Sequence, residues 1–484
     1  MIRSAARVLT ACWLSGLALA SESNLADAVE KGDRGKISGL MSSGSDVNAA
    51  QIDGMTALHW AVHQDDAATA RLLVEAGARV TVSNRYGVTP LSLACQNGNS
   101  EIVRLLLEKG ADPDIALNGG ETALMTAART GRADCVKLLL ARGAEVNAKE
   151  HSGQTAVMWA AAEGHADVVA LLIEAGADFR TPLPSGFTPL LFAVRAGRAE
   201  VVRLLIKAGA DVRAIARLEP GKPGRGVTST APLLLAIENG HFELALELVD
   251  AGADPNDQRS GFTPLHNLTW VRKTGIGEEA DGQPPPAGSG KVTSLDFIRA
   301  LVKRGADVNA RLTESSGAQG HVNAKGATPL LFAAESADLP MIRLLVELGA
   351  DPFLPNDEGC SPLMAAAGMG TFATEEEAGT EPEAIETVNY LLEKGADINT
   401  VDQKGETAMH GAAYKSFPQM VRLLAANGAD ITRWNRKNQS GWTPLLIARG
   451  YRLGNYRPAP ATTQALIEAM QAKGAEIPPD PGPR

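Results

Sequence analysis

Apolar residues along this chain recur at the spacing of short amphipathic helices. Ile102, Val103, Leu105 and Leu106, for example, fall on one face of a helix. An alanine-rich helical segment precedes each leucine-rich one, and its small side chains allow neighbouring helices to approach closely. A glycine, such as Gly98, separates the two segments. The pattern predicts pairs of short antiparallel helices joined by polar turns.

These pairs repeat with a fixed period. A Gly-Ala-Asp-like triplet returns every 33 residues over the first part of the chain and twelve times in all. Its glycines are Gly44, Gly77, Gly110, Gly143, Gly176, Gly209, Gly252, Gly305, Gly349, Gly395, Gly428 and Gly474. A period of this length indicates a stack of small units, each of which buries its apolar face only against its neighbours.

A second marker in phase with the triplet predicts where each first helix begins. Thr89-Pro90-Leu91 and Thr188-Pro189-Leu190 are typical copies. The threonine hydroxyl can cap free backbone N–H groups, and proline fits the first helical position. A glycine two residues earlier, such as Gly87, supplies the positive φ of a tight turn.

Together these residues resemble the ankyrin repeat, whose pattern is Gly-x-Thr-Pro-Leu-His, two alanines, Gly-His, a run of leucines and Gly-Ala-Asp. The resemblance covers nearly all of the chain after Ser21. It implies an all-α ankyrin-repeat solenoid, a curved right-handed stack of helix-turn-helix units with β-hairpin loops. The family histidine is present only at His59, His266 and His410, and the seventh unit lacks the leading Gly and Thr.

The repeats divide the chain into segments. We expect an N-terminal capping repeat at 21–53, regular repeats at 54–213 and an inserted loop at 214–230. Further repeats then fill 231–477, followed by a Pro-rich tail at 478–484. Long insertions interrupt the later repeats at 271–293, 311–325, 368–383 and 450–460.

The first twenty residues have the form of a secretory signal peptide. Arg3 and Arg7 supply a basic region, Val8 to Leu19 is apolar, and Ala18-Leu19-Ala20 is a small-x-small cleavage pattern. Two alternatives stay open: an uncleaved anchor, and lipidation at Cys12. We therefore expect an exported protein, periplasmic or secreted, with no membrane insertion after signal cleavage.

Charge narrows the classes of partner. The net charge is −10 and only 4% of the residues are aromatic. An acidic chain has no electrostatic affinity for nucleic acid or for an anionic membrane. Proteins of unstated identity are the expected partners, with no nucleic acid among them, and the chain itself is expected to be a monomer.

Signatures of catalysis are weak. Gly288-Ser289-Gly290-Lys291 lacks the first glycine and the Ser/Thr of a phosphate loop. His59 and His63 are spaced like metal ligands, but His59 occupies the family histidine place, which is structural. We expect no enzyme activity, no cofactor and no metal site.

Burial can be predicted for several residues from their place in the repeat. Cys95 and Cys135 fall at helix core places and should be buried, whereas Cys360 follows a turn glycine and should lie at the surface. Trp60, Trp159, Phe192 and Phe332 fall at the inner leucine place of the first helix and are assigned to the core. Asn438, in a nominal glycosylation site, should be accessible.

The resemblance also implies a partner-binding surface, a concave face made of hairpin tips and the exposed ends of the first helices. The candidate residues at those places are Arg85, Tyr86, Gln96, Asn97, Asn118, Glu121, Arg129, His151, Gln154, Phe187, Arg195, Phe262, Trp270, Tyr414 and Trp442. Aromatic side chains beside arginines are typical of interface hot spots.

The leading hypothesis is a non-catalytic scaffold or adaptor that binds partner proteins through this concave groove outside the cytoplasm. An alternative is a dedicated protective or inhibitory partner of a single enzyme. A third is an enzyme whose site lies in the inserted loops.

Overall fold

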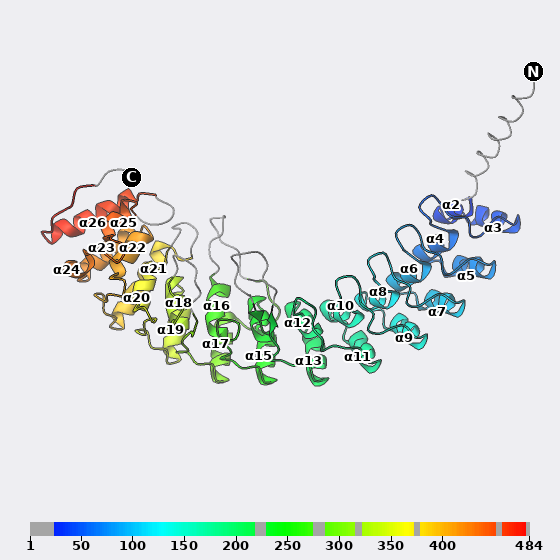
Figure 1. Cartoon of the computed structure of the whole chain (residues 1–484), viewed down its shortest axis with the longest axis horizontal. Helices are drawn as coiled ribbons and strands as arrows, with labels where there is room; N and C mark the ends of the chain where they lie inside the picture. Colours follow the sequence, from blue (N-terminus) through cyan, green and yellow to red (C-terminus); the bar gives the residue numbers. More distant parts are fainter. Residues whose placement is uncertain are drawn as a thin grey trace, which may run out of the picture. The chain divides into compact units, whose positions relative to one another are not determined.

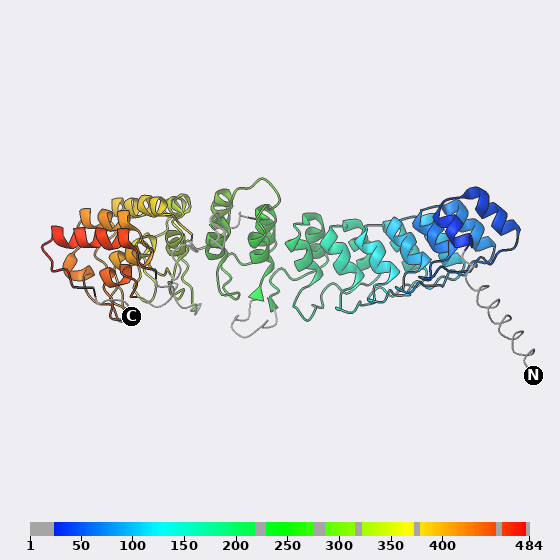
Figure 2. The ribbon, with the colours of Figure 1, turned by 90° about the horizontal axis from the view of Figure 1, so that it is seen from above.

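A computed structural model describes residues 24–217, 229–273, 286–314, 322–371, 378–451 and 457–480. The expected leader and parts of each expected insertion lie outside these residues. The chain divides into two compact units, residues 1–211 and 212–484. Both consist of short helices joined by turns, which confirms the predicted all-α solenoid of helix-turn-helix repeats (Figures 1 and 2).

The first unit begins with α2 (Asn24–Glu30) and α3 (Arg34–Ser42). The first helices of its next five repeats are α4 (Ala57–His63), α6 (Pro90–Asn97), α8 (Ala123–Arg129), α10 (Ala156–Glu163) and α12 (Pro189–Arg195). The second helices are α5 (Ala67–Glu75), α7 (Ser100–Glu108), α9 (Ala133–Ala141), α11 (Ala166–Glu174) and α13 (Ala199–Lys207). In Figure 1 the first helices form one row of this unit and the second helices form another.

The second unit follows the same plan with more variation in helix length. Its paired helices are α14 (Pro232–Glu238), α15 (Phe242–Asp250), α16 (Pro264–Arg272), α17 (Ser294–Lys303), α18 (Pro329–Glu335), α19 (Leu339–Glu347), α20 (Pro362–Ala366), α21 (Glu381–Glu393), α22 (Ala408–Tyr414), α23 (Pro418–Ala426), α25 (Pro444–Ala448) and α26 (Pro460–Ala472). A short extra helix, α24 (Ile431–Trp434), lies between the last two repeats. Two-residue strands β1 (Ala216–Arg217) and β2 (Ser229–Thr230) pair antiparallel, with Ala216 opposite Thr230.

Helix caps lie where the sequence places them. The Thr89 hydroxyl accepts a hydrogen bond from Ser92 N at 3.1 Å, and Pro90 is the first residue of α6. Gly87, in the hairpin ahead of this cap, has a φ of 80°. A Cβ at Gly87 would lie 2.9 Å from Asn118 N, so this glycine is required both by its backbone angle and by the close approach of the next hairpin.

The core lies between the two rows of helices. Leu91 and Leu124 from first helices and Leu106 and Leu139 from second helices are 0–1% exposed. Cys95 and Cys135 are also buried, as predicted, and burial raises the pKa of the Cys135 thiol to about 11. The apolar stripe on each helix is therefore covered by the neighbouring repeats, as a solenoid requires.

The prediction for Cys360 is wrong. Its side chain is only 4% exposed, and its backbone N donates to Asn356 Oδ1 at 2.9 Å within the hairpin. Burial, and after it the nearby carboxylates of Asp402, Glu335 and Glu406, hold the pKa of the thiol well above its usual value. The residue after the turn glycine thus faces the neighbouring repeat here, and its exposure could not be inferred from the turn alone.

The family histidines have the expected structural role. His266 Nε2 lies 3.1 Å from Ala327 O, and Nδ1 lies 2.6 Å from the Thr263 hydroxyl. His59 makes the corresponding contacts, with Nε2 3.1 Å from Val88 O. These two rings thus join their own helix caps to the backbone of the following repeat, whereas Nε2 of His410 has no hydrogen-bond partner among the described residues. In the part of the chain that the structure describes, no group of three or more His, Cys, Asp or Glu residues is suited to hold a metal ion.

A ladder of asparagines joins successive repeats at a second place. In each case Nδ2 donates to the glycine carbonyl of the next Gly-Ala-Asp triplet, and Oδ1 accepts from the backbone N two residues after that glycine. The asparagines are Asn48, Asn147, Asn256, Asn309 and Asn399. Both backbone groups lie just beyond a second helix, outside its hydrogen bonds, and the asparagine side chain gives each of them a partner.

Candidate protein-docking site

The hairpins that precede the first helices share one backbone geometry. In the third repeat Asn84 N donates to Val88 O at 2.9 Å, and Arg85 N donates to Asp53 O of the preceding hairpin at 3.0 Å. These bonds align neighbouring hairpins along one side of the first unit (Figure 2). We call the exposed surface of α4, α6, α8, α10 and α12, together with the hairpin before each, the first-helix face.

One end of the first-helix face has exposed apolar side chains at the hairpin tips. Tyr86 is 59% exposed, and the guanidinium carbon of Arg85 lies 5.1 Å from the centre of its ring. Ile52, on the preceding hairpin, is fully exposed. The exposed part of each side chain contributes no hydrophobic stabilisation to the free protein.

Farther along the face, Arg129 lies between a carboxylate and an aromatic ring. Its Nη2 is 3.3 Å from Glu121 Oε1, and its guanidinium carbon is 5.7 Å from the ring centre of Trp159 in the next repeat. Glu121 Oε1 also accepts from the Thr126 hydroxyl at 3.0 Å. Trp159 Nε1 is buried and donates to no acceptor among the described residues.

Arg195 lies against two aromatic rings at the edge of a hollow. Its guanidinium carbon is 5.1 Å from the ring centre of Phe187 and 5.3 Å from that of Phe192. The two rings are 5.3 Å apart and tilted by 57°. The hollow has a volume of about 430 Å³, and its lining comes from the hairpins of two repeats and from α12: Ser152, Gln154, Leu183, Pro184, Ser185, Phe187, Phe192 and Arg195.

Other predicted residues of this face lie at its surface but also hold the repeats together. Asn97 Nδ2 donates to Val62 O at 2.8 Å, and Asn118 Nδ2 donates to Arg85 O at 3.4 Å. Gln96 is exposed beside Asn97. His151 is also exposed, and its backbone N donates to Gly119 O of the preceding hairpin at 3.1 Å. Gln154 is half-buried and lines the hollow.

Three residues that line the first-helix face were assigned wrongly. Trp60, Trp159 and Phe192 are partly exposed, whereas the fourth predicted core ring, Phe332, is 5% exposed and buried as expected. The inner place of the first helix lies at the boundary between core and surface, so a large ring fills the core and still reaches the outside. Thr126 at the same place in α8 is only 4% exposed, so the place in the repeat does not by itself decide exposure.

In the second unit the predicted aromatic residues form two separate groups. Phe262 and Trp270 meet edge to face with ring centres 4.5 Å apart, and Trp270 lies 5.4 Å from Phe332. Trp270 is 39% exposed. This cluster is therefore largely packed against itself, with one face of Trp270 left at the surface.

The second group combines Tyr414 with buried polar side chains. The Tyr414 hydroxyl donates to Glu406 Oε1 at 2.7 Å, and Asn438 Nδ2 donates to the same oxygen at 2.7 Å. Asn438 is buried, so the prediction that it is accessible is wrong. Trp442 is half-buried, and its backbone N donates to Asn438 Oδ1 at 3.0 Å. Tyr414 and Trp442 thus lie at the edge of a network that orders the hairpin.

In the hairpin at residues 402–406, before α22, one buried carboxylate lies beside another. Burial raises the pKa of Asp402 to about 6, and the charge of Glu406 adds to this effect. The backbone N–H groups of Glu406 and Lys404 donate to Asp402 Oδ1 at 2.8 and 2.9 Å and act in the opposite direction. These bonds are those of a turn, and Asp402 serves as its hydrogen-bond acceptor.

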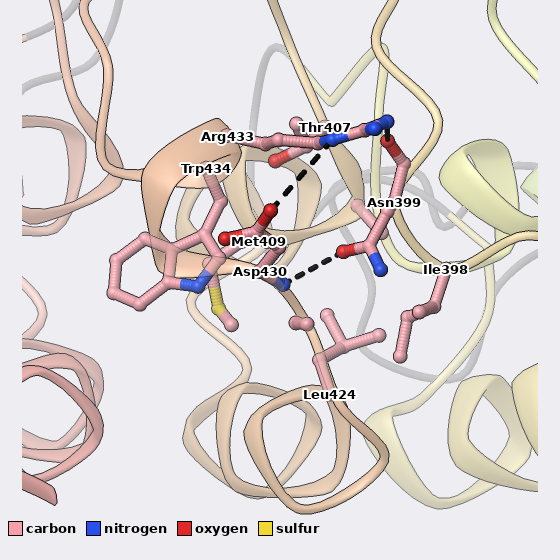
Figure 3. Close-up of a pocket in the computed structure, with 10 residues that line it drawn as sticks. Ile398, Asn399, Thr407, Met409, Leu424, Asp430, Arg433 and Trp434 are labelled. Carbon is pink, nitrogen blue, oxygen red and sulfur yellow. Dashed lines mark hydrogen bonds and ion pairs between the residues drawn. The ribbon is translucent and has the colours of Figure 1, made fainter. Parts of the chain in front are cut away.

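A small cavity lies below the last hairpins, between residues 398 and 434 (Figure 3). Its volume is about 10 Å³, which is room for about one water molecule. Asn399 and Asp430 lie at its rim, joined by the hydrogen bond from Asp430 N to Asn399 Oδ1 at 2.7 Å. The cavity is an internal feature of the repeat junction and is too small for a substrate.

Comparison with known proteins matches the repeated pattern. Family models described as ankyrin repeats match residues 25–117, 124–216 and 378–456, and further ones match 98–140, 330–374 and 230–259. No helix among the described residues has the length and apolarity needed to span a bilayer.

Similar proteins share only part of their length with this chain. The mouse B-cell lymphoma 3 protein homolog is 33% identical over 132 residues, which are 27% of this chain and 26% of that protein. Human ankyrin repeat and SOCS box protein 16 is 32% identical over 177 residues, 36% and 33% of the two chains. Human SH3 and multiple ankyrin repeat domains protein 2 is 30% identical over 184 residues, 34% and 9%. The shared stretch covers no more than about a third of any of these relatives.

Proposed function

Because this chain belongs to the ankyrin-repeat family, we propose that it is a non-catalytic scaffold that holds partner proteins on its first-helix face, outside the cytoplasm. The observation that carries the proposal is the row of arginines and part-exposed rings on that face, with the hollow at Phe187, Phe192 and Arg195. Tyr, Trp and Arg are the side chains that dominate binding energy at protein interfaces.

The physical argument rests on what these side chains do in the free protein. Tyr86 and Ile52 keep apolar surface in water, and Trp159 leaves a buried N–H without an acceptor among the described residues. A partner that covers the rings would bury this apolar surface, and the burial would stabilise the complex. The bonds between hairpins and helices hold the row rigid, which lowers the entropic cost of binding.

Export is the second part of the proposal and is supported by the leader pattern at residues 1–20. The test is to fractionate cells that express the full chain and to sequence the N-terminus of the mature protein. We expect an envelope or secreted protein that begins at Ser21. A cytoplasmic protein that retains Arg3 and Arg7 would contradict this part and would leave the docking face untouched.

Affinity capture from an envelope or secreted fraction tests the docking function. The test variant changes Tyr86, Arg129 and Phe187 to Ala, all of which lie on the first-helix face. The control variant changes Leu72, Arg104 and Lys137 to Ala, since these side chains are exposed on second helices. We expect the test variant to lose specific partners and the control variant to retain them. Undiminished capture by the test variant would reject the proposed face.

The stoichiometry of the captured complex distinguishes a scaffold from the alternative, a dedicated inhibitor or protector of a single enzyme. A scaffold predicts several partners of moderate affinity. One tight complex of fixed stoichiometry with one enzyme would favour the alternative.

A further inference from the structure

Two arginines occupy equivalent places on the first-helix face. Arg129 lies seven residues after the capping Thr122, and Arg195 lies seven residues after Thr188. Each guanidinium is stacked on an aromatic ring, Arg129 on Trp159 and Arg195 on Phe187 and Phe192. A guanidinium stacked on a ring keeps its positive charge at the surface, and a guanidinium can bind a carboxylate in a bidentate manner.

The spacing of the two arginines follows from helix packing. Helix α8 packs on α10, and α10 packs on α12. Packed helices lie about 8–10 Å apart, so the two arginines are separated by about 16–20 Å. An extended chain covers about 3.3 Å per residue, and about five to six residues span this distance.

Aromatic rings lie on the surface between the arginines. Trp159 and Phe192 are partly exposed there, and the hollow of about 430 Å³ beside Phe192 is lined by Leu183 and Pro184 as well. This surface suits large apolar side chains located between two charged ones. A ligand complementary to the whole stretch therefore has negative charges at both ends and apolar groups in the middle.

Acidic residues near the arginines do not preclude such a ligand. Glu121 pairs with Arg129 at 3.3 Å, but the two side chains are 25% and 39% exposed. Ion pairs of this kind contribute little and can be exchanged for a better partner. Glu163, at the end of α10, is also exposed on this face and will disfavour a carboxylate placed at the middle of the ligand.

We propose that the first-helix face between α8 and α12 binds an extended protein segment with two acidic side chains about five residues apart and large apolar side chains between them. The inference rests on the proposed docking function and specifies its ligand. Single-stranded nucleic acid also combines anionic phosphates with aromatic bases. The protein's net charge of −10, however, repels a polyanion that has one negative charge per nucleotide.

The test uses fluorescein-labelled octapeptides and the full chain, with binding measured by fluorescence anisotropy. The probe has two glutamates about five residues apart, with leucine and phenylalanine between them. One control peptide has glutamines in place of the glutamates, and another has the two glutamates side by side. We expect the probe to bind at least about fivefold more tightly than either control, as expected for a carboxylate pair that engages two arginines.

Variants locate the site on the protein. Arg129→Gln and Arg195→Gln should each lower the affinity for the probe by about fivefold, and neither should change the affinity for the glutamine peptide. Arg104→Gln removes a positive charge from α7 and should change the affinity for neither the probe nor the glutamine peptide. Phe192→Ala should weaken the probe and the glutamine peptide alike. Circular dichroism and a melting curve check that each variant keeps the fold.

The outcomes separate this inference from the docking proposal. Equal affinity for the three peptides, or an equal loss with Arg104→Gln, would overturn the ligand assignment. Tighter binding of a labelled oligothymidylate than of the probe would overturn it as well. If capture of cellular partners nevertheless depends on Tyr86, Arg129 and Phe187, the docking face stands and only its proposed ligand is wrong.

Discussion

Asn399 accepts a hydrogen bond from the backbone N of Asp430, one repeat ahead, at 2.7 Å (Figure 3). Its Nδ2 donates to Gly428 O at 3.4 Å. The same double contact recurs at four other asparagines, so one side chain per junction ties the end of one second helix to the loop of the repeat before it. In the third repeat Asp114 holds this place and accepts from Glu145 N at 2.7 Å.

Replacement of Asn399 should therefore loosen one junction. We expect Asn399→Ala to lower the free energy of unfolding by about 1–3 kcal/mol, because it leaves the Asp430 N–H and the Gly428 carbonyl without their partner. Asn399→Asp should cost less, since an aspartate retains the acceptor, as Asp114 does. Urea denaturation measures both. Asn435→Ala is the control, because the Asn435 side chain makes no hydrogen bond with the described residues; equal losses at both sites would contradict the account.

Arg272 and Asp338 form a buried pair that joins α16 to the start of α19. Arg272 Nε and Nη2 lie 2.7 and 3.0 Å from the two Asp338 oxygens, and the Asp338 side chain is 2% exposed. We expect Arg272→Ala to cost about 3–5 kcal/mol, because it leaves a buried carboxylate without its cation. Thermal or urea denaturation provides the measurement.

Arg71→Ala serves as the matched comparison for this prediction. Arg71 and Glu101 are paired at 2.6 Å, but their side chains are 49% and 60% exposed. Loss of an exposed pair should cost no more than about 1 kcal/mol. If the two arginine variants were equally stable, burial would not be the source of the effect.

His266 should remain neutral well below the usual pH of histidine titration. Burial lowers the pKa of His266 to about 4 in the folded chain, against 6.5 for an exposed histidine. Between these values the unfolded chain binds a proton that the folded chain does not, so this residue makes folding less favourable as the pH falls from 6.5 to 4. The loss approaches about 3 kcal/mol at the lower limit.

NMR titration of the His266 ring checks this prediction directly. We expect the His266 ring to stay unprotonated above about pH 5. At lower pH the chain should unfold, and only then should the ring bind a proton as an exposed histidine does. A midpoint near 6.5 in the folded protein would contradict the buried hydrogen-bonded ring.

The thiol of Cys360 should be unreactive in the folded protein. It is buried, and its pKa is held well above the usual value, so little thiolate forms at neutral pH. Brief iodoacetamide treatment followed by mass spectrometry of the peptides should show no label at Cys95, Cys135 or Cys360, and full label after denaturation. Rapid labelling of Cys360 alone would contradict its burial and support the surface position expected from its turn.

Local features of the fold could be predicted from the sequence because they depend on neighbouring residues. The Thr89 cap, the proline at the first helical position and the positive φ of Gly87 are all set within a few residues. Asp65, Ala337 and Ser416 adopt the same left-handed φ, of 57°, 54° and 59°. They hold the place between the two helices that Gly98 and Gly131 hold in other repeats, so the turn of the repeat sets this conformation and residue type alone does not reveal it.

The candidate site was only partly predictable for a related reason. Arg129, Arg195 and Phe187 were identified from their places in the repeat, but Trp159 and Phe192, which complete their surroundings, were assigned to the core. Whether a ring at the inner place is covered depends on the side chains of two adjoining repeats. The sequence period gives the place of each residue but not the fit between neighbours.

Site-specific photo-crosslinking tests the central claim, that partner proteins dock on the first-helix face, most directly. A photoreactive phenylalanine analogue would replace Tyr86 or Phe187 on that face, or Leu72, which is 52% exposed on α5. The account predicts that irradiation of cells that express the protein natively yields crosslinks to the same partners from Tyr86 and Phe187, and none to them from Leu72. Crosslinks to those partners from Leu72 alone would contradict it.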